Sequence, residues 1–447
     1  MYKVAISLGE MTLKGFQTRS KFETILKENL KKSLNIKKVR KDGGKFLLEI
    51  EEDKEKIKYK LERIFGIATF SFVEEFKYTN IDELKQKIKE KYPNIKGKKF
   101  RITGKVLNHK GMNSIKLQKI LGEVLFNEGG IVKLKEFDLE IFVYLRENKV
   151  QIYEEVHKGS YGLPLGSQGK ILVLFSGGLD SPVASYEIMR RGCKPIFLFI
   201  NLGGKEHLRQ VYEIYGKICN EWANGIDTDF YVLDGKPIVN LIKEKITPSY
   251  RQVVLKKCFY VAAEKMCFKN KCDAIITGEN LGQVSTQTLK NLNAIQSGIN
   301  KLIMRPLITK EKNEIINSAK KIGTYELSSN IGELCNISDK GGIKTASSVG
   351  EVEFEYLKIK GEVEGFLEFV SIDTFSEIKT KEIDWDNSTI IDLYKQKIDI
   401  NKLNKNEKYV ICCKDGIQAS IECDTLKELG FNCISIKTSK VPKNTKK

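Results

Sequence analysis

Cysteine and histidine are scarce in this chain. Its 447 residues include ten cysteines, the first of them Cys193, and only three histidines. So sparse a set excludes a disulfide scaffold and a zinc site of paired Cys-x2-Cys motifs, since Cys267 and Cys272 stand by themselves. We therefore expect most cysteines to be reduced, buried small side chains, and we expect no metal site built from protein ligands alone.

Long apolar runs are also missing. No stretch approaches the ~18 consecutive apolar residues that a membrane-spanning helix needs. The opening string, MYKVAISLGEMTLKG, lacks the apolar segment and cleavage site of a secretory signal. The sequence thus predicts a cytoplasmic protein with no membrane partner.

Positive charge is in excess and is unevenly placed. There are 76 Lys and Arg against 58 Asp and Glu, a formal net charge of +18. Residues 1–170 hold 36 basic and 23 acidic side chains, a net +13, which leaves +5 for the rest. A biased codon pool would load lysine throughout the chain, so the uneven placement favours a nucleic-acid partner for the front end.

The length predicts two to four domains, and the pattern throughout is an alternation of strands and helices. The first 70 residues read as a small ferredoxin-like α/β sandwich, and a second α/β unit follows. The expected elements there are strands at 2–8, 46–50 and 99–105, helices at 19–34, 57–65, 81–92 and 114–126, and a hairpin at 139–154.

The most informative stretch is ILVLFSGGLDSPVASYEIMRRG, from Ile171 to Gly192. Five apolar residues predict a buried parallel strand, and a helical pattern follows Ser181. The two glycines between them allow a ligand to approach the backbone closely, and a helix N-terminus suits a phosphate. Asp180 beside an anion implies a magnesium ion or a reacting group between them. A tight turn without any ligand is the simpler alternative.

This loop is not a Walker A motif, which requires Gly-x4-Gly-Lys-Ser/Thr. SGGLDS instead resembles the PP-loop of the ATP pyrophosphatases, which release pyrophosphate and leave AMP on the substrate. Strands expected at 195–200, 230–233 and 274–277 continue a parallel sheet, at whose carboxyl edge ligands collect. Four residues at two strand ends offer a place for adenine or are simply core: Leu174, Phe175, Phe199 and Ile200.

Further strings extend the resemblance: GQVSTQTLKNL at 282–292, Arg305-Pro306-Leu307, Glu333-Leu334-Cys335 and, near the start, GEMTLKGFQTRSKFE. With SGGLDS they make the chain similar to the tRNA 4-thiouridine synthases of the ThiI family, over essentially its whole length. The resemblance implies an α/β multidomain fold. Its domains are a ferredoxin-like domain (1–55), an RNA-binding THUMP domain (56–166), a PP-loop ATP pyrophosphatase domain with helices on both faces of a parallel sheet (167–368), and a shortened rhodanese-like sulfur-carrier domain (371–447).

The resemblance also implies roles for individual residues. Lys312 matches a lysine that stabilises charge at the reacting centre, together with Asp180. Lys256 matches a basic residue near the phosphates, although by themselves both lysines would be taken for surface residues. Twelve residues match positions of the family's nucleotide site: Leu174, Phe175, Ser176, Gly177, Gly178, Asp180, Ser181, Phe199, Ile200, Lys256, Gly278 and Gln287.

Two cysteines complete the implied machinery. Cys335 lies in a loop rich in Ser, Asn and Gly and matches a catalytic cysteine that resolves a persulfide. Cys413 stands between an expected strand and an expected helix, where backbone N–H groups favour a thiolate and can hold a persulfide. Its string, Cys413-Lys-Asp-Gly416, resembles the Cys-x-x-Gly loop of rhodanese-like domains.

The rhodanese match is incomplete. Only 20 residues separate Asp392 from Cys413, and Tyr394 stands where such strands have arginine. We expect a trimmed domain with a more open site. The alternative is a packing domain in which Cys412 and Cys413 are inert.

The implied reaction is ATP-dependent transfer of sulfur to the uridine at position 8 of tRNA, through an adenylated uracil and a cysteine persulfide. ATP and Mg2+ are the implied cofactors. The implied partners are tRNA, a cysteine desulfurase as sulfur donor and a sulfur-carrier protein for the thiazole of thiamine; a homodimer is left open. The alternatives are another PP-loop enzyme that thiolates RNA or amidates a small acid, and a non-catalytic THUMP RNA-binding protein.

Overall fold

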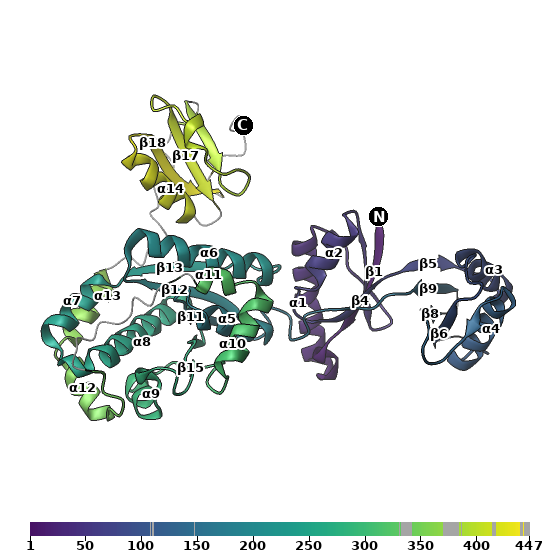
Figure 1. The fold of residues 1–447 in the computed structure, drawn as a ribbon, viewed down its shortest axis with the longest axis horizontal. Coiled ribbons are helices and arrows are strands. Elements are labelled where there is room, and N and C mark those ends of the chain that lie inside the picture. Colours follow the sequence, from purple (N-terminus) through teal and green to yellow (C-terminus); the bar gives the residue numbers. More distant parts are fainter. Residues whose placement is uncertain are drawn as a thin grey trace. The chain divides into compact units, whose positions relative to one another are not determined.

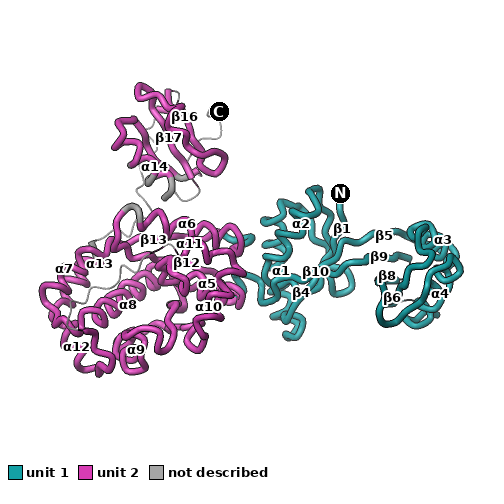
Figure 2. Tube along the Cα trace, in the orientation of Figure 1, with its two compact units in different colours: residues 1–167, 224–226 teal, residues 168–223, 227–447 magenta. Residues whose placement is uncertain are grey.

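The computed structural model describes residues 1–107, 109, 111–146, 148–329, 331, 342–369, 384–385, 387–413, 417–438 and 441. The chain forms two compact units (Figure 2). Unit 1 comprises residues 1–167 and 224–226, and unit 2 comprises residues 168–223 and 227–447.

Unit 1 begins with a five-stranded antiparallel sheet of order β10-β4-β1-β3-β2. Figure 1 labels β1 and β4 of this sheet and the helix α1 beside them. Phe22, Leu26 and Leu30 recur every four residues on α1, so one face of this helix is buried against the sheet. The elements are β1 (Tyr2–Leu8), η1 (Glu10–Leu13), α1 (Phe16–Leu34), β2 (Arg40–Asp42), β3 (Lys45–Ile50), α2 (Lys54–Leu61), β4 (Ile67–Phe72) and β10 (His157–Lys158).

The first domain extends further than the sequence suggested. β4 pairs with β1, with Phe72 opposite Val4, and Ile57 and Leu61 of α2 are buried in the same core. The boundary expected after residue 55 therefore lies inside this domain. The sequence gives no sign of the true boundary, because only Val73 separates β4 from the next strand.

The second sheet of unit 1 has the order β5-β9-β8-β6-β7, and α3 and α4 bury Leu84, Ile88, Leu117 and Leu121 in its core. The expected hairpin is β8 and β9, which pair in antiparallel fashion. The elements are β5 (Glu74–Lys77), α3 (Ile81–Lys91), β6 (Lys99–Val106), α4 (Ser114–Asn127), β7 (Ile131–Val132), β8 (Leu139–Leu145) and β9 (Lys149–Tyr153).

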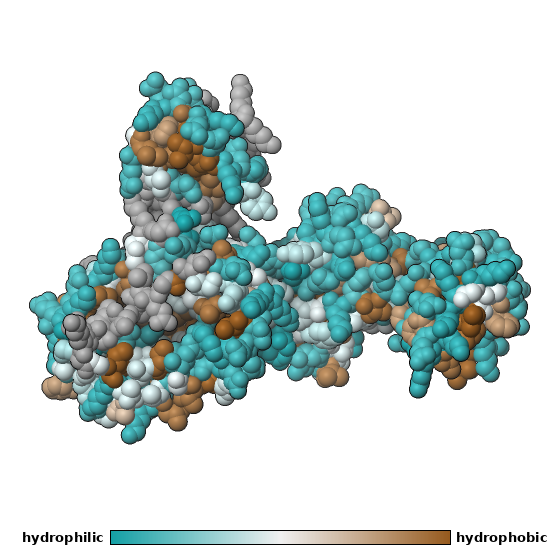
Figure 3. Space-filling view, in the orientation of Figure 1, coloured by the Kyte–Doolittle hydropathy of each residue, from teal (hydrophilic) through white to brown (hydrophobic). Residues whose placement is uncertain are grey.

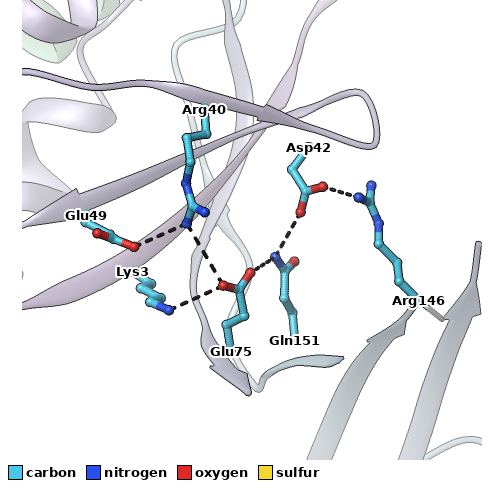
Figure 4. A network of polar contacts seen from close by, with 7 residues as sticks. All are labelled: Lys3, Arg40, Asp42, Glu49, Glu75, Arg146 and Gln151. Atoms are coloured by element: carbon cyan, nitrogen blue, oxygen red, sulfur yellow. Dashed lines mark hydrogen bonds and ion pairs between the residues drawn. The ribbon is translucent and has the colours of Figure 1, made fainter. Parts of the chain in front are cut away.

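A polar network links the two sheets of unit 1 (Figure 4). The Gln151 side chain on β9 donates to Glu75 on β5 at 3.0 Å, and Lys3 on β1 lies 3.3 Å from the same carboxylate. Arg146, just after β8, pairs with Asp42 at the end of β2. Ionic contacts therefore join the two sheets in addition to the strands that run between them.

Unit 2 contains the expected parallel sheet, in the order β13-β12-β11-β14-β15. Helices cover both of its faces, α7, α8 and α13 on one and α5 and α6 on the other (Figure 1). The strands are β11 (Lys170–Leu174), β12 (Lys194–Asn201), β13 (Asp229–Asp234), β14 (Ala274–Ile276) and β15 (Leu302–Met304). The helices are α5 (Asp180–Arg190), α6 (Gly204–Trp222), α7 (Lys236–Lys245), η2 (Pro248–Tyr250), α8 (Arg251–Asn270), η3 (Ser285–Gln287), α9 (Leu289–Gln296), α10 (Lys312–Ile322), α11 (Tyr325–Ser329), α12 (Val349–Leu357) and α13 (Lys360–Phe369).

The C-terminal part of unit 2 is a small parallel sheet of order β16-β17-β18 on which α14 packs. This confirms the expected small α/β fold, and it adds a third strand that the sequence pattern did not predict. The elements are β16 (Ser388–Asp392), η5 (Ile400–Lys402), β17 (Lys408–Cys413), α14 (Ile417–Glu428) and β18 (Asn432–Lys437).

Candidate functional site

The SGGLDS loop joins β11 to α5 at the carboxyl edge of the parallel sheet. The Ser176 N–H donates to the Ser181 hydroxyl at 3.1 Å, which folds the loop back onto the start of α5. Gly177 has a φ of +76°, and a Cβ there would lie 2.8 Å from Val211 on α6. Only glycine fits this position without strain.

The backbone of the loop is available to an anion. Within the described part of the chain, no acceptor takes the N–H of Gly177 or Gly178. The N-terminus of α5 follows directly and adds the positive end of its dipole. Unpaired N–H groups beside a helix N-terminus suit a phosphate or pyrophosphate group.

Asp180, the first residue of α5, lies between two donors from distant parts of the chain. Its carboxylate is 3.1 Å from the Lys312 ammonium and accepts from the Gln283 amide at 3.0 Å. Its side chain stays 23% exposed and that of Lys312 46%. The structure thus brings together Asp180 and Lys312, which are 132 residues apart. Gln283 was missed, although it lies in the GQVSTQ string.

Gly278 holds the loop after β14 against the start of α5. A Cβ at Gly278 would lie 2.8 Å from the Ser181 nitrogen and 2.9 Å from the Asp180 carbonyl carbon, both of them backbone atoms. Gln287 shapes the same loop, because its amide oxygen accepts from the Asn280 N–H at 3.3 Å. Both residues therefore lie on the segment that faces SGGLDS.

A buried polar cluster anchors this segment, and sequence reasoning missed it. Glu279, 7% exposed, accepts from Arg305 at 2.8 Å, from Thr277 at 3.0 Å and from the Tyr260 hydroxyl. Burial, together with the Glu279 charge, raises the pKa of Tyr260 above its ordinary value. Burial acts to lower the pKa of Arg305, but Tyr260 and Glu279 outweigh it and raise that pKa. The only signal was the Arg305-Pro306-Leu307 string.

The apolar strand ends are mostly core. Phe175, Phe199 and Ile200 are 2%, 1% and 8% exposed, and only Leu174 is partly buried. A polar group missed from the sequence lies beside them. The His207 ring on α6 meets Phe199 edge-on at 5.0 Å, and among the described residues its buried Nδ1 has no hydrogen-bond partner. Burial lowers the pKa of His207, which favours the neutral ring.

Lys256 is not brought to the loop by any contact among the described residues. Its ammonium lies 5.7 Å from the centre of the Phe259 ring. The neighbouring Lys257 is buried instead, donates to the Ser297 carbonyl at 2.7 Å and pairs with Glu353 at 2.6 Å. The expected role of Lys256 near the phosphates stays a prediction.

Cys413 ends β17, and its sulfur accepts the Ala419 N–H from the first turn of α14 at 3.3 Å. The thiol is only 6% exposed and belongs to the core under α14. Cys412 points into a different cluster, where burial raises its pKa. Cys335 lies outside the described residues.

Neither a cluster of metal ligands nor a membrane-spanning helix occurs in the described ranges. No group of three or more His, Cys, Asp or Glu side chains there could hold a metal ion. Among the same residues, no helix combines the length and apolarity that a membrane crossing requires.

Comparisons with known proteins agree with this geometry. Residues 3–71 match the ThiI ferredoxin-like domain, 78–155 the THUMP domain, and 166–360 the family described as thiamine biosynthesis protein (ThiI). A probable tRNA sulfurtransferase of Saccharolobus islandicus is 37% identical over 348 residues, which cover 77% of this chain and 92% of that protein. The chain belongs to the ThiI family of tRNA sulfurtransferases.

Two further relatives extend the comparison. A probable tRNA sulfurtransferase of Sulfurisphaera tokodaii is 35% identical over 362 residues, 80% of this chain and 97% of that protein. The crystal structure of a 4-thiouridine synthetase in complex with RNA, with bound ATP, has a TM-score of 0.72 at 26% identity and covers 83% of this chain and 98% of that one. These findings confirm the resemblance and the multidomain α/β fold. The three family matches together end at residue 360, before the C-terminal sheet.

Proposed function

We propose that this protein is an ATP-dependent sulfurtransferase that converts a uridine of tRNA, at position 8, into 4-thiouridine. The observation that carries the proposal is the edge formed by SGGLDS, Asp180, Lys312 and Gly278, in a chain 37% identical to a probable tRNA sulfurtransferase. A relative of known structure, called a 4-thiouridine synthetase, holds ATP and RNA.

The loop fits the triphosphate of ATP. The N–H groups of Gly177 and Gly178, which no acceptor within the described ranges takes, bind the β- and γ-phosphates together with the start of α5. The Lys312 ammonium neutralises charge beside them. Asp180, a partly exposed carboxylate, would hold Mg2+ together with phosphate oxygens, and the ion supplies further charge neutralisation. Adenine lies toward the ends of β11 and β12, where the buried Nδ1 of His207 has no partner among the described residues.

The first chemical step activates the uracil. Its O4 attacks the α-phosphorus of ATP, the bond to the β-phosphate oxygen breaks, and pyrophosphate leaves into the loop. Donors already aimed at the departing charge lower the barrier, and removal of one such donor typically costs about 10²–10³-fold in rate. C4 then carries AMP as a leaving group.

Unit 1 supplies the tRNA surface. Residues 1–170 carry a net +13, and the visible face of unit 1 is mostly hydrophilic (Figure 3). Leu13 and Phe16 are nonetheless 86% and 87% exposed where η1 leads into α1, beside the exposed Lys14. The first turn of α1 has no acidic residue and no side-chain cap. An exposed ring next to a cation and open N–H groups suits a base and its phosphate.

The sulfur step uses both expected cysteines. The terminal sulfur of a Cys413 persulfide attacks C4 and AMP leaves. Cys335 thiolate then attacks the Cys413 sulfur, which releases the thiolated uridine and leaves a Cys335–Cys413 disulfide for a thiol reductant to reopen. Because Cys413 is 6% exposed, this step requires the first turn of α14 to move away from it.

Partners follow from the same chemistry. A cysteine desulfurase supplies the sulfane sulfur to Cys413. The family description as a thiamine biosynthesis protein supports a second outlet, transfer of sulfur to a carrier protein for the thiazole ring. Self-association into a homodimer is a further proposal that a sedimentation measurement would test.

The experiment that tests the function is analysis of nucleosides from unmodified tRNA incubated with protein, ATP, Mg2+ and a persulfide donor. We expect 4-thiouridine in amounts equal to the AMP and pyrophosphate released. Thiolation of a different base would favour another PP-loop enzyme. tRNA binding without any AMP would favour a non-catalytic RNA-binding protein.

A further inference from the structure

The C-terminal sheet holds a cysteine pair that the sulfur-transfer chemistry does not use. The sulfurs of Cys423, on α14, and Cys433, on β18, are 2.8 Å apart. Both side chains are buried, at 1% and 2% exposure, in the core between the helix and the sheet. The Cys433 sulfur also lies 3.0 Å from the Cys423 carbonyl oxygen.

The fold sets this proximity locally. α14 ends in a turn where Gly430 takes a φ of +87° and the Phe431 N–H bonds to the Leu426 carbonyl at 3.0 Å. This turn sends the chain directly into β18 beneath the helix. Cys423 and Leu426, three residues apart, share the inward face of α14 and so meet the inward face of β18.

From this geometry we propose that Cys423 and Cys433 form a redox-active pair that closes to a disulfide. A disulfide bond is about 2.05 Å long, so the two sulfurs need to approach by under about 1 Å. Burial excludes large oxidants, so the oxidant is a small one of the peroxide class. One Cys thiol loses its proton and attacks the peroxide as a thiolate, and the O–O bond breaks. The displaced hydroxide takes up that proton, so a sulfenic acid and water form. The second thiol attacks the sulfenic sulfur, and a second water leaves as the S–S bond forms.

The pair acts on the helix that contacts Cys413. Ala419, whose N–H reaches the Cys413 sulfur, lies one helical turn before Cys423 on the same face of α14. Closure of the disulfide joins this helix to β18 through its second turn. The reduced pair is a two-electron store in the same core as the sulfur carrier proposed above.

The test is disulfide mapping of the full-length protein. Reduced protein is treated with hydrogen peroxide, alkylated under denaturing conditions and digested. We expect the peptides of Cys423 and Cys433 to be joined, with a mass lower by two hydrogens, and a thiol reductant to reverse this. Cys423→Ser and Cys433→Ser should each abolish the linkage, whereas Cys412→Ser, equally buried on the opposite face of β17, should leave it unchanged.

The outcome does not depend on ATP or tRNA, so it is separable from the proposed function. The wild-type map needs no variant and stands even if a serine variant fails to fold. Retention of both thiols at a peroxide dose that oxidises a free cysteine peptide added to the same sample would overturn the proposal. So would linkage of either cysteine to Cys413 in place of the other.

Discussion

Two strand-to-helix connections in unit 2 carry the candidate chemistry, and the residues beside them have opposite surroundings. β11 meets α5 at SGGLDS, and β17 meets α14 at Cys413, each at the carboxyl end of a parallel strand. The first turn presents Asp180 at 23% exposure to Lys312 and Gln283. The second keeps Cys413 at 6% exposure against its own helix. The residues around SGGLDS are thus already accessible to a ligand, whereas the Cys413 thiol must be uncovered before it can react.

Replacement of Cys413 should have the largest effect and should separate the two turns. We expect Cys413→Ala to abolish sulfur transfer from a persulfide donor and to leave tRNA-dependent AMP formation intact, because adenylation needs no thiol. Mass spectrometry of nucleosides and AMP assays on the same samples measure both. Cys412→Ala, an adjacent buried thiol on the other face of β17, is the control. Loss of both activities, or retained transfer, would count against the assignment.

Asp180→Asn should reduce AMP formation by about 10²–10³-fold, since it removes the carboxylate proposed to hold Mg2+ beside the phosphates. Sulfur loading of Cys413 from the donor should not change. Asp234→Asn is the matched control, because Asp234 is an exposed carboxylate at the end of the parallel strand β13. Equal rates of AMP formation by the two variants would show that Asp180 has no role in the adenylation step.

Lys312→Met should lower AMP formation by about 10- to 100-fold, through loss of one charge-assisted contact. A steady-state rate at saturating ATP reports it. Lys310→Met, two residues earlier, removes a similarly exposed lysine that pairs with Glu314. If Lys310→Met is as damaging as Lys312→Met, the effect belongs to the loop and not to the Asp180 contact.

Gly278→Ala should weaken ATP binding by about 1–3 kcal/mol, because the new Cβ overlaps backbone atoms at the start of α5. Calorimetric titration with ATP measures it. Gly216→Ala in α6 meets no atom within 4 Å and should leave binding unchanged. Unaltered ATP affinity in Gly278→Ala would mean that the loop after β14 does not set the position of SGGLDS.

Phe16→Ala should have the smallest effect, a loss of tRNA affinity of about 1 kcal/mol, or about fivefold. This is the lower end of the range for one base stacked on an aromatic ring. The loss should be independent of salt, whereas Lys14→Ala should lose affinity that depends on salt. Fluorescence anisotropy at two salt concentrations separates them. Phe354→Ala, an exposed phenylalanine of unit 2, is the control. A salt-dependent loss in Phe16→Ala would contradict stacking.

Features that depend on neighbouring residues or on a regular apolar pattern could be predicted from the sequence. SGGLDS, its strand and its helix follow from one continuous string, and Lys312 was placed by resemblance alone. The contacts of Gln283 and the Tyr260–Glu279–Arg305 cluster were not predictable, because they join segments that only the sheet order brings together.

Burial was the other limit. The sequence around a cysteine between a strand and a helix does not reveal whether the helix covers its side chain. Cys413 is 6% exposed in this structure, which differs from the open site that we expected. The first domain boundary failed for a related reason, since β4 pairs backward in the sequence with β1 and no glycine-rich linker follows it.

The central claim is that ATP at SGGLDS activates the uracil oxygen for replacement by sulfur. Its most direct test supplies sulfide as the sulfur source, which bypasses Cys413, to an unmodified tRNA with Mg2+ and ATP. The account predicts 4-thiouridine at position 8 with one AMP and one pyrophosphate for each residue formed. Thiolation without ATP, or ATP cleaved to ADP and phosphate, would contradict it.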